Sequence, residues 1–439
     1  MRKHTSTSKL VLRLTSMLAV GFIMTSMAAG CGPGGSSQPG DTSGSGSNTV
    51  DDGKTRLVLW DNEQNEVLFS AITAFEEQNP DVRIVVEAQG ETSLDMAINA
   101  GTAPDIIMGP SDYVATYGRK GYTIDLTPYG AKDIQPLFSE SCWNVANAIS
   151  DKIYGIPFDS NIINFVVNKD MFDAAGATIP TTYEEMITAG NKIKAHYNSG
   201  EYYAYTAAAF DCLNHPNIGY KAWGTFQYYW WLWRMGGDIF NADQTEPTLN
   251  SQEGVEALQR LLDLKNNGLA PDKYYLSEFL DGKVAMIELT TKDFFNTAVA
   301  SKKANFQVAM MPTLKEGVEP WTGMGLYCYS VTSASKNPQI AYDFLKFYCT
   351  NVEYQISYCK PYYFLPSLVE AQEDPYYKTT DWKIILEQAK YARATPGVNN
   401  WRAMDDAVYD AIQEAVTGSK TAKAALDAAV EQIKVLMNE

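Results

Sequence analysis

Histidine and positive charge are both scarce in this sequence. Only three of its 439 residues are histidine, and 35 Lys and Arg stand against 52 Asp and Glu, which gives a net charge of -17. Because phosphate backbones are held by clustered Lys and Arg, this balance disfavours nucleic-acid binding. The sequence contains no HExxH motif and no Gly-rich phosphate loop, so it predicts neither a metal site nor a nucleotide cofactor.

A bilayer-spanning apolar run is also missing. Four positive charges within residues 2–13 precede a short apolar stretch at 14–27, whereas a spanning helix needs roughly 20 apolar residues. We interpret residues 1–30 as a signal peptide. The stretch ends in MAAGC, which resembles a bacterial lipobox and implies lipid attachment to Cys31. The Gly- and Ser-rich composition up to residue 53 predicts a flexible tether, which places the protein on the outer face of the cytoplasmic membrane.

Cysteine spacing gives little further chemistry. Five cysteines follow the lipobox, and they are Cys142, Cys212, Cys328, Cys349 and Cys359. An odd number cannot all pair, and no CxxC spacing suggests zinc or redox chemistry. We expect most of them to be small buried hydrophobes. A disulfide between Cys349 and Cys359 is left open.

The pattern from residue 56 onward predicts an α/β fold. Short apolar strands at 56–60, 82–87 and 105–108 alternate with helical periodicity, which favours a parallel sheet with helices on both faces. Ligands of such sheets bind beyond the carboxyl ends of the strands, so the loops at 61–65 and 109–112 are expected to share a site. Further helices are predicted at 182–197, 223–235, 251–267, 338–350, 402–416 and 421–437.

Seven stretches, in order, resemble the extracellular solute-binding proteins of carbohydrate ABC importers, the maltose-binding-protein-like family. They are RLVLWDNEQNEVLFSAITAFEEQNPDVRIVVE, GTAPDII with KGYTIDLTPY, YGIPFDSNIINFVVNKD with its following helix start, MGGDIFNADQTEPTLNSQEGVEAL, FLDGKVAM, SVTSASKNPQIAYDFLKFY and LPS. Together they cover almost all of residues 56–437. Here VVNK stands where a tyrosine is common before Asn-Lys.

The resemblance implies a two-lobed periplasmic-binding-protein-like fold with interleaved lobes joined by a hinge. The first lobe is expected at 54–159 and 327–364, and the second at 160–326 and 365–439. The implied role is that of a monomer that carries its ligand to two ABC permease subunits and, through them, to a cytoplasmic ATPase.

Candidate sugar-binding residues of the first lobe follow its first and third strands. A sugar presents hydroxyls at its edge, which carboxylate and amide groups bind well. Asp61, Asn62, Glu63 and Gln64 offer four such groups in one loop. Asp112 lies where the family has a sugar-binding aspartate, and an N-cap of the next helix is its alternative role.

Further candidates lie at the crossover and in aromatic segments. Asp159 and Asn161 follow the Gly-Ile-Pro crossover, and Asn161 falls where the family has a sugar-contacting glutamate. In FQYYWWLWRMGGDIF some rings must face the core, so only one or two are expected in the cleft, with Trp230 first and Tyr229 next. Trp321 is a stacking candidate beside glycines that allow close approach of backbone to ligand. Trp401 is a candidate on the second lobe.

The sequence therefore predicts a non-enzymatic protein that captures an oligosaccharide between two closing lobes. One alternative keeps the fold and binds ferric ion through adjacent tyrosines, such as Tyr228 and Tyr229. Another is a glycoside-processing enzyme, in which two facing carboxylates would come from among Asp61, Glu63, Asp112 and Asp159.

Overall fold

The computed structural model describes residues 53–89, 93–147, 151–210, 219–273 and 276–438. The predicted signal peptide, Cys31, the tether and Cys212 lie outside these residues. None of the described helices is both long and apolar enough to span a membrane.

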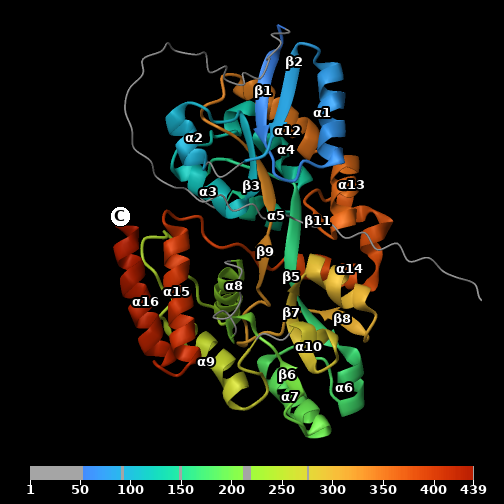
Figure 1. Ribbon diagram of the computed structural model, residues 1–439, viewed down its shortest axis with the longest axis vertical. Coiled ribbons are helices and arrows are strands. Elements are labelled where there is room, and N and C mark those ends of the chain that lie inside the picture. The colour runs from blue at the N-terminus through green and yellow to red at the C-terminus, as the bar shows by residue number, and fades with distance from the viewer. Residues whose placement is uncertain (1–52, 90–92, 148–150, 211–218, 274–275, 439) are drawn as a thin grey trace, which may run out of the picture. The chain divides into compact units, whose positions relative to one another are not determined.

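The helices of the described chain are interspersed among the strands (Figure 1). They are α1 (Glu66–Gln78), α2 (Leu94–Ala100), α3 (Ser111–Arg119), α4 (Ala131–Ile134), α5 (Glu140–Ala146), α6 (Lys169–Ala175), α7 (Tyr183–Tyr197), α8 (Gly219–Arg234), α9 (Gln252–Asn266), α10 (Leu276–Leu280), α11 (Thr291–Asp293), α12 (Pro338–Cys349), α13 (Val352–Tyr362), α14 (Thr380–Ala389), α15 (Trp401–Val416) and α16 (Ala422–Met437).

The strands are between two and ten residues long. They are β1 (Thr55–Trp60), β2 (Val82–Glu87), β3 (Ile106–Pro110), β4 (Ile156–Pro157), β5 (Asp159–Asn168), β6 (Tyr203–Tyr205), β7 (Val284–Thr290), β8 (Phe306–Ala309), β9 (Thr322–Gly325), β10 (Tyr327–Val331), β11 (Leu365–Pro366) and β12 (Ala392–Arg393).

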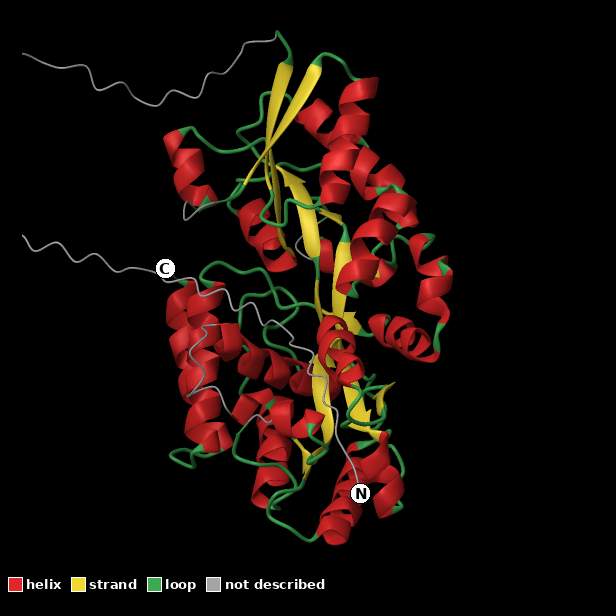
Figure 2. Cartoon of the chain, turned by 45° about the vertical axis from the view of Figure 1, so that its right-hand side comes forward, coloured by secondary structure: helices red, strands yellow, loops and turns green. Residues whose placement is uncertain are grey.

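Two sheets form the centres of two lobes, and helices flank both of them (Figure 2). The first sheet has the order β2-β1-β3-β10-β4. Its strands β1, β2 and β3 are parallel, as the sequence predicts, whereas β10 runs antiparallel to β3 and β4. The second sheet has the order β12-β9-β5-β7-β6, and β8 and β11 also pair with β5. This is the predicted two-lobed α/β architecture.

The chain passes between the sheets at short links, which interleaves the lobes. Strand β4 belongs to the first sheet and β5, which begins two residues later, to the second. Strand β9 likewise belongs to the second sheet and β10 to the first. The predicted bounds of the lobes stay a prediction, and the two links lie within two residues of the expected boundaries at 159/160 and 326/327.

Local sequence explains why the helices begin and end where they do. The Asn65 side chain accepts a hydrogen bond from the Leu68 amide at 2.9 Å, which caps α1. Helix α2 ends at Gly101, whose φ of 70° is left-handed and suits glycine. Helix α16 buries Ala425, Leu426 and other members of its apolar stripe against the core, as its periodicity predicts.

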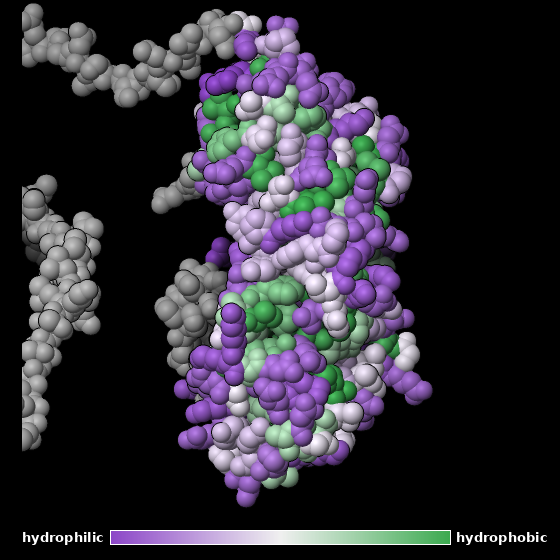
Figure 3. All heavy atoms as spheres, turned by 90° about the vertical axis from the view of Figure 1, so that its right-hand side faces the viewer, coloured by the Kyte–Doolittle hydropathy of each residue, from purple (hydrophilic) through white to green (hydrophobic). Residues whose placement is uncertain are grey.

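Burial separates the interior from the surface clearly. One core surrounds α8 and another lies around the first sheet. On the face drawn in Figure 3, hydrophobic residues form small patches among hydrophilic ones. Cys142, Cys328, Cys349 and Cys359 are all buried and free. The open question of a Cys349–Cys359 disulfide is thus answered: each thiol fills a small apolar space as a hydrophobe.

We expect iodoacetamide to label Cys349 and Cys359 only after unfolding, because burial shields both thiols and raises their pKa. Peptide mass spectrometry without reductant should find both unlabelled in the native protein and both labelled in guanidinium. A reduced sample is the control and should give the same labelling. A disulfide-linked peptide pair in the unreduced sample would contradict the structure.

Candidate functional site

A cavity of about 370 Å³ lies between the two lobes, within the size range of ligand pockets. The start of α3 borders it from the first lobe, and β5, α8 and the β7–α11 turn border it from the second. Its wall is completed by the β9–β10 link and the segment 393–395. Five of the predicted site residues line this cavity: Asp112, Asp159, Asn161, Tyr229 and Trp230.

One wall of the cavity is the aromatic face of α8. Phe226, Tyr229, Trp230 and Trp233 all line it, and their spacing of i, i+3, i+4 and i+7 places them on one side of the helix. The expectation of only one or two rings in the cleft is therefore wrong. Phe226 is half-buried, whereas the other three are almost entirely buried. Phe226 is consequently the ring with the most accessible surface.

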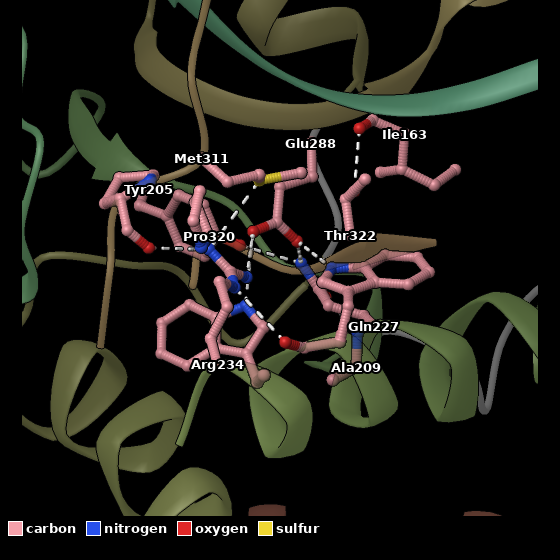
Figure 4. A network of polar contacts seen from close by, with 12 residues as sticks. Ile163, Tyr205, Ala209, Gln227, Arg234, Glu288, Met311, Pro320 and Thr322 are labelled. Carbon is pink, nitrogen blue, oxygen red and sulfur yellow. Dashed lines mark hydrogen bonds and ion pairs between the residues drawn. The ribbon is translucent and has the colours of Figure 1, made fainter. Parts of the chain in front are cut away.

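The helix that carries these rings is held by a single carboxylate on the side away from the cavity. Glu288, in β7, accepts hydrogen bonds at Oε2 from Trp230 Nε1 (2.7 Å) and Gln227 Nε2 (2.8 Å). Its Oε1 accepts from Arg234 Nη2 (2.8 Å) and Trp231 Nε1 (3.2 Å). Figure 4 shows Glu288 facing Gln227 and Arg234 at the centre of this network. These four donors form a second stripe on α8. It is displaced by one residue from the stripe of rings that lines the cavity, and Trp230 belongs to both stripes.

Arg234 completes the support beneath the cavity. Its side chain is only 1% exposed, and it also donates to the carbonyl oxygens of Trp230 (3.2 Å) and Pro312 (3.4 Å). Its guanidinium lies 5.2 Å from the Trp231 ring centre, a cation–π contact. The planar fork of an arginine suits such a site because it donates in several directions at once.

Close packing fixes Trp230 on its other side. A Cβ built on Gly323, in β9, would lie 2.8 Å from a carbon of the Trp230 ring. The glycine beside Trp321 therefore permits close approach of this ring, where the sequence analysis expected close approach of ligand to backbone. Trp401 is half-buried and packs on Tyr229 with ring centres 5.7 Å apart, so it supports the aromatic wall without lining the cavity.

Polar groups form the rest of the cavity wall. Asp112 does not cap α3, because the helix begins at Ser111 and the capping position is Pro110. It lies instead in the first turn, where the positive end of the helix favours an acid, although burial raises its pKa. Asn161 Oδ1 accepts from the Lys292 amide at 3.2 Å. The amide nitrogen of this side chain is a donor available to the cavity.

Asp159 is the most deeply buried acid of the cavity. It is 1% exposed and lies at the start of β5. Burial raises the pKa of its carboxyl to about 7, and the charge of Glu63 adds to the rise. The hydrogen bond from the Tyr327 amide to Oδ1 (3.2 Å), the Tyr358 hydroxyl and the Lys292 charge act in the opposite direction.

The first predicted loop does not reach the cavity wall. Asp61 is 1% exposed, and its Oδ1 accepts from the Glu63 amide (2.8 Å) while Oδ2 accepts from the Tyr329 hydroxyl (2.7 Å). It shapes the loop and is not available as a ligand-binding group. Asn62 accepts from the Gln89 amide at 2.8 Å. Neither these residues nor Gln64 line the cavity, and Glu63 acts on it only through its charge.

Trp321 lines a second, larger cavity of about 760 Å³, which shares the segment 393–395 with the first. Arg393 stands between them. Its guanidinium lies 4.8 Å from the Trp233 ring centre and 5.4 Å from that of Trp321, and it forms an ion pair with Asp238. This stacked cation keeps the wall between the two cavities in place.

Sequence reasoning missed several lining residues, among them Phe226, Thr290, Lys292 and Arg393. Lys292 had a usable signal, since it lies two residues after the buried strand β7, close to the position that drew attention to Asp61 after β1. Glu288 had one too, because it is the single acid in the apolar strand VAMIELT. Arg393 lies in a segment with no periodic pattern, so nothing pointed to it.

Within the described residues, no three His, Cys, Asp or Glu side chains gather closely enough to hold a metal ion. The cavity combines flat apolar rings with carboxyl, amide and ammonium groups. Such a combination binds a small polar molecule by stacking and by hydrogen bonds.

Two interleaved α/β lobes with a ligand-sized cavity between them define a ligand-capture protein. Sequence comparison identifies it further: the chain belongs to the family of bacterial extracellular solute-binding proteins, which it matches over residues 70–385. The galactooligosaccharide-binding protein of Bacillus subtilis is 24% identical over 97% of both chains. A maltooligosaccharide ABC transporter solute-binding lipoprotein of Streptococcus pneumoniae is 22% identical over 96% of this chain and 97% of its own.

Solved structures agree on the fold. The crystal structure of a cyclic α-maltosyl-1,6-maltose binding protein from Arthrobacter globiformis superposes with a TM-score of 0.75. The two sequences are 23% identical, and the match covers 88% of this chain and 100% of the other. The expected architecture is thereby confirmed.

Removing Glu288 should destabilise the protein strongly, because Glu288→Ala leaves the Arg234 charge buried without its partner. We expect a loss of about 3–5 kcal/mol in the free energy of unfolding. Asp281→Ala is the control, since it breaks the exposed Lys303–Asp281 pair and should leave the free energy of unfolding nearly unchanged. Urea titrations followed by circular dichroism measure both, and equal losses would contradict the role given to Glu288.

Proposed function

We propose that this protein captures an oligosaccharide between its two lobes as the binding subunit of an ABC importer. The observation that carries the proposal is the cavity, in which aromatic rings of α8 face carboxyl and amide groups. A sugar has apolar C–H faces that stack on rings and hydroxyl edges that bind carboxylates and amides. The names of the galactooligosaccharide- and maltooligosaccharide-binding relatives support the same class of ligand.

Delivery would take place at the outer face of the bacterial cytoplasmic membrane. The protein would act as a monomer, anchored by lipid on Cys31, and would pass its ligand to two permease subunits coupled to a cytoplasmic ATPase. The lipobox-like sequence before Cys31 supports the anchor, as does the lipoprotein name of the Streptococcus pneumoniae relative.

The two alternatives receive less support from the cavity. The tyrosines that line it are Tyr229 and Tyr327, which are not adjacent in sequence, and the Tyr229 hydroxyl donates to Asp405 at 2.8 Å. Ferric binding through a tyrosine doublet is therefore disfavoured. Asp112 and Asp159 do line the cavity, but carboxyl groups around a sugar also serve binding alone, and the family is one of solute-binding proteins.

Calorimetric titration of the fragment from Thr49 with maltodextrins and galactooligosaccharides tests the proposal. We expect micromolar binding of at least one series, about -8 kcal/mol, and no new products after prolonged incubation. A parallel titration with ferric citrate should give no tyrosinate absorption band. Ferric binding without sugar binding, or cleavage of a bound sugar, would replace the proposal with one of the alternatives.

Phe226→Ala should weaken sugar binding roughly fivefold, because a lost stacking contact is worth about 1 kcal/mol. Asp112→Asn should weaken it at least about tenfold through the loss of a charge-assisted hydrogen bond. Phe69→Ala removes an exposed ring on α1 and serves as the matched control, with unchanged affinity. If the first two variants melt like wild type and bind like the control, these residues do not contact the ligand.

Cys31→Ala should abolish lipid attachment and release the protein from the membrane fraction, because the sulfur that would carry the lipid is gone. Metabolic labelling with an alkyne fatty acid, followed by fractionation, measures both effects. Cys142→Ala is the control and should remain labelled. Persistent label and membrane association of the Cys31→Ala protein would refute the anchor.

A further inference from the structure

One carboxyl oxygen of a cavity-lining residue has no hydrogen bond of good geometry within the described chain. Asp159 Oδ1 accepts from the Tyr327 amide at 3.2 Å, whereas Oδ2 is buried and has no such partner, although the nearby Tyr358 hydroxyl lowers the pKa of this carboxyl. A buried polar atom left without a partner is uncommon and costs free energy. Because Asp159 lines the cavity, a bound molecule is the natural source of the missing donor.

Charged and titratable groups surround Asp159 on several elements; Asp112 lines the same cavity, and each of the others acts on the carboxyl or is acted on by it. They are Glu63 after β1, Lys292 in α11, Tyr327 in β10, Tyr358 in α13, Asp112 in α3 and the buried thiols Cys142, Cys328 and Cys359.

The balance among these groups leaves the carboxyl close to half ionised at neutral pH, since burial and the Glu63 charge raise its pKa to about 7 while Tyr358 and Lys292 oppose the rise. A small added preference for one form is thus enough to change its protonation. A hydroxyl that donates a hydrogen bond to Oδ2 stabilises the ionised form.

We propose that Asp159 couples ligand capture to proton release: a hydroxyl of the bound sugar donates to Oδ2 of the ionised carboxylate, and the carboxyl proton leaves to solvent. This inference rests on the proposed function and deepens it, because it makes a hydroxyl donor at this position a requirement for tight binding. It also makes affinity depend on pH in a stated direction. Below the midpoint the proton must be displaced first, so affinity falls about tenfold per pH unit.

The test is calorimetric titration with maltotetraose and with a galactooligosaccharide between pH 5.5 and 8.5. Each titration is repeated in phosphate and in Tris, whose different ionisation enthalpies reveal the number of protons released. We expect affinity to rise with pH and to level off above about pH 7. Release should approach one proton per ligand at low pH and fall towards zero at pH 8.5.

Asp159→Asn should make affinity independent of pH across this transition and abolish proton release. The Asn side chain can still accept from the Tyr327 amide, and above neutral pH it removes a buried charge. Its melting temperature at pH 8 is therefore expected to be no lower than that of wild type. This measurement separates lost coupling from lost folding.

Two milder variants should move the midpoint in opposite directions. Tyr358→Phe removes a group that lowers the Asp159 pKa, so the midpoint should rise. Glu63→Gln removes a charge that raises it, so the midpoint should fall. Asp381→Asn is the control, because burial also raises the pKa of this carboxyl but it does not line the cavity. A merely structural Asp159 would give neither shift.

The outcomes are distinct. Failure of both sugars to bind at any pH would overturn the proposed function for these ligands, and the inference with it. Binding of wild type with pH-independent affinity would overturn the inference alone. So would pH dependence that survives in Asp159→Asn or disappears in Asp381→Asn.

Discussion

The buried carboxylate of Glu288 is the interaction on which the rest of the site depends. Removing a carboxylate from water is costly unless its oxygens are fully hydrogen-bonded and its charge is paired. Here each oxygen of Glu288 accepts two hydrogen bonds. All four donors belong to α8, and the donor Arg234 also supplies the paired positive charge. One side chain of β7 therefore fixes both the position and the rotation of the helix that forms the aromatic wall.

Much of the fold could be predicted because its signals are local. The alternation of strands and helices from residue 56 and the apolar stripe of α16 follow from neighbouring residues alone, and the structure confirms them. The interleaving of the lobes was accessible only through resemblance, because pairing of β10 between β3 and β4 joins residues more than 150 positions apart. No local pattern records such a contact.

The site was predicted less well, because a residue type does not say what it contacts. Asp61 has the right chemistry and follows the right strand, but a tyrosine from β10 and two amides of its own loop occupy its oxygens. The aromatic run of α8 was recognised, yet its division between core and cavity depends on rotation, which Glu288 sets from 54 to 61 residues away. Arg393 lies in a segment without a periodic pattern, so its place at the cavity could be found only from contacts between distant segments.

The two stripes of α8 have a consequence for how this protein can diverge. Successive residues of a helix are rotated by about 100°, so the stripe that anchors the helix and the stripe that faces the cavity are nearly separate. Only Trp230 belongs to both. Phe226, which is only half-buried, is thus free to change during adaptation to a new nutrient without loosening the helix, whereas Tyr229 is also held by Trp401 and Asp405. Insertion of a single residue between Phe226 and Arg234 would turn the Phe226 ring away from the cavity.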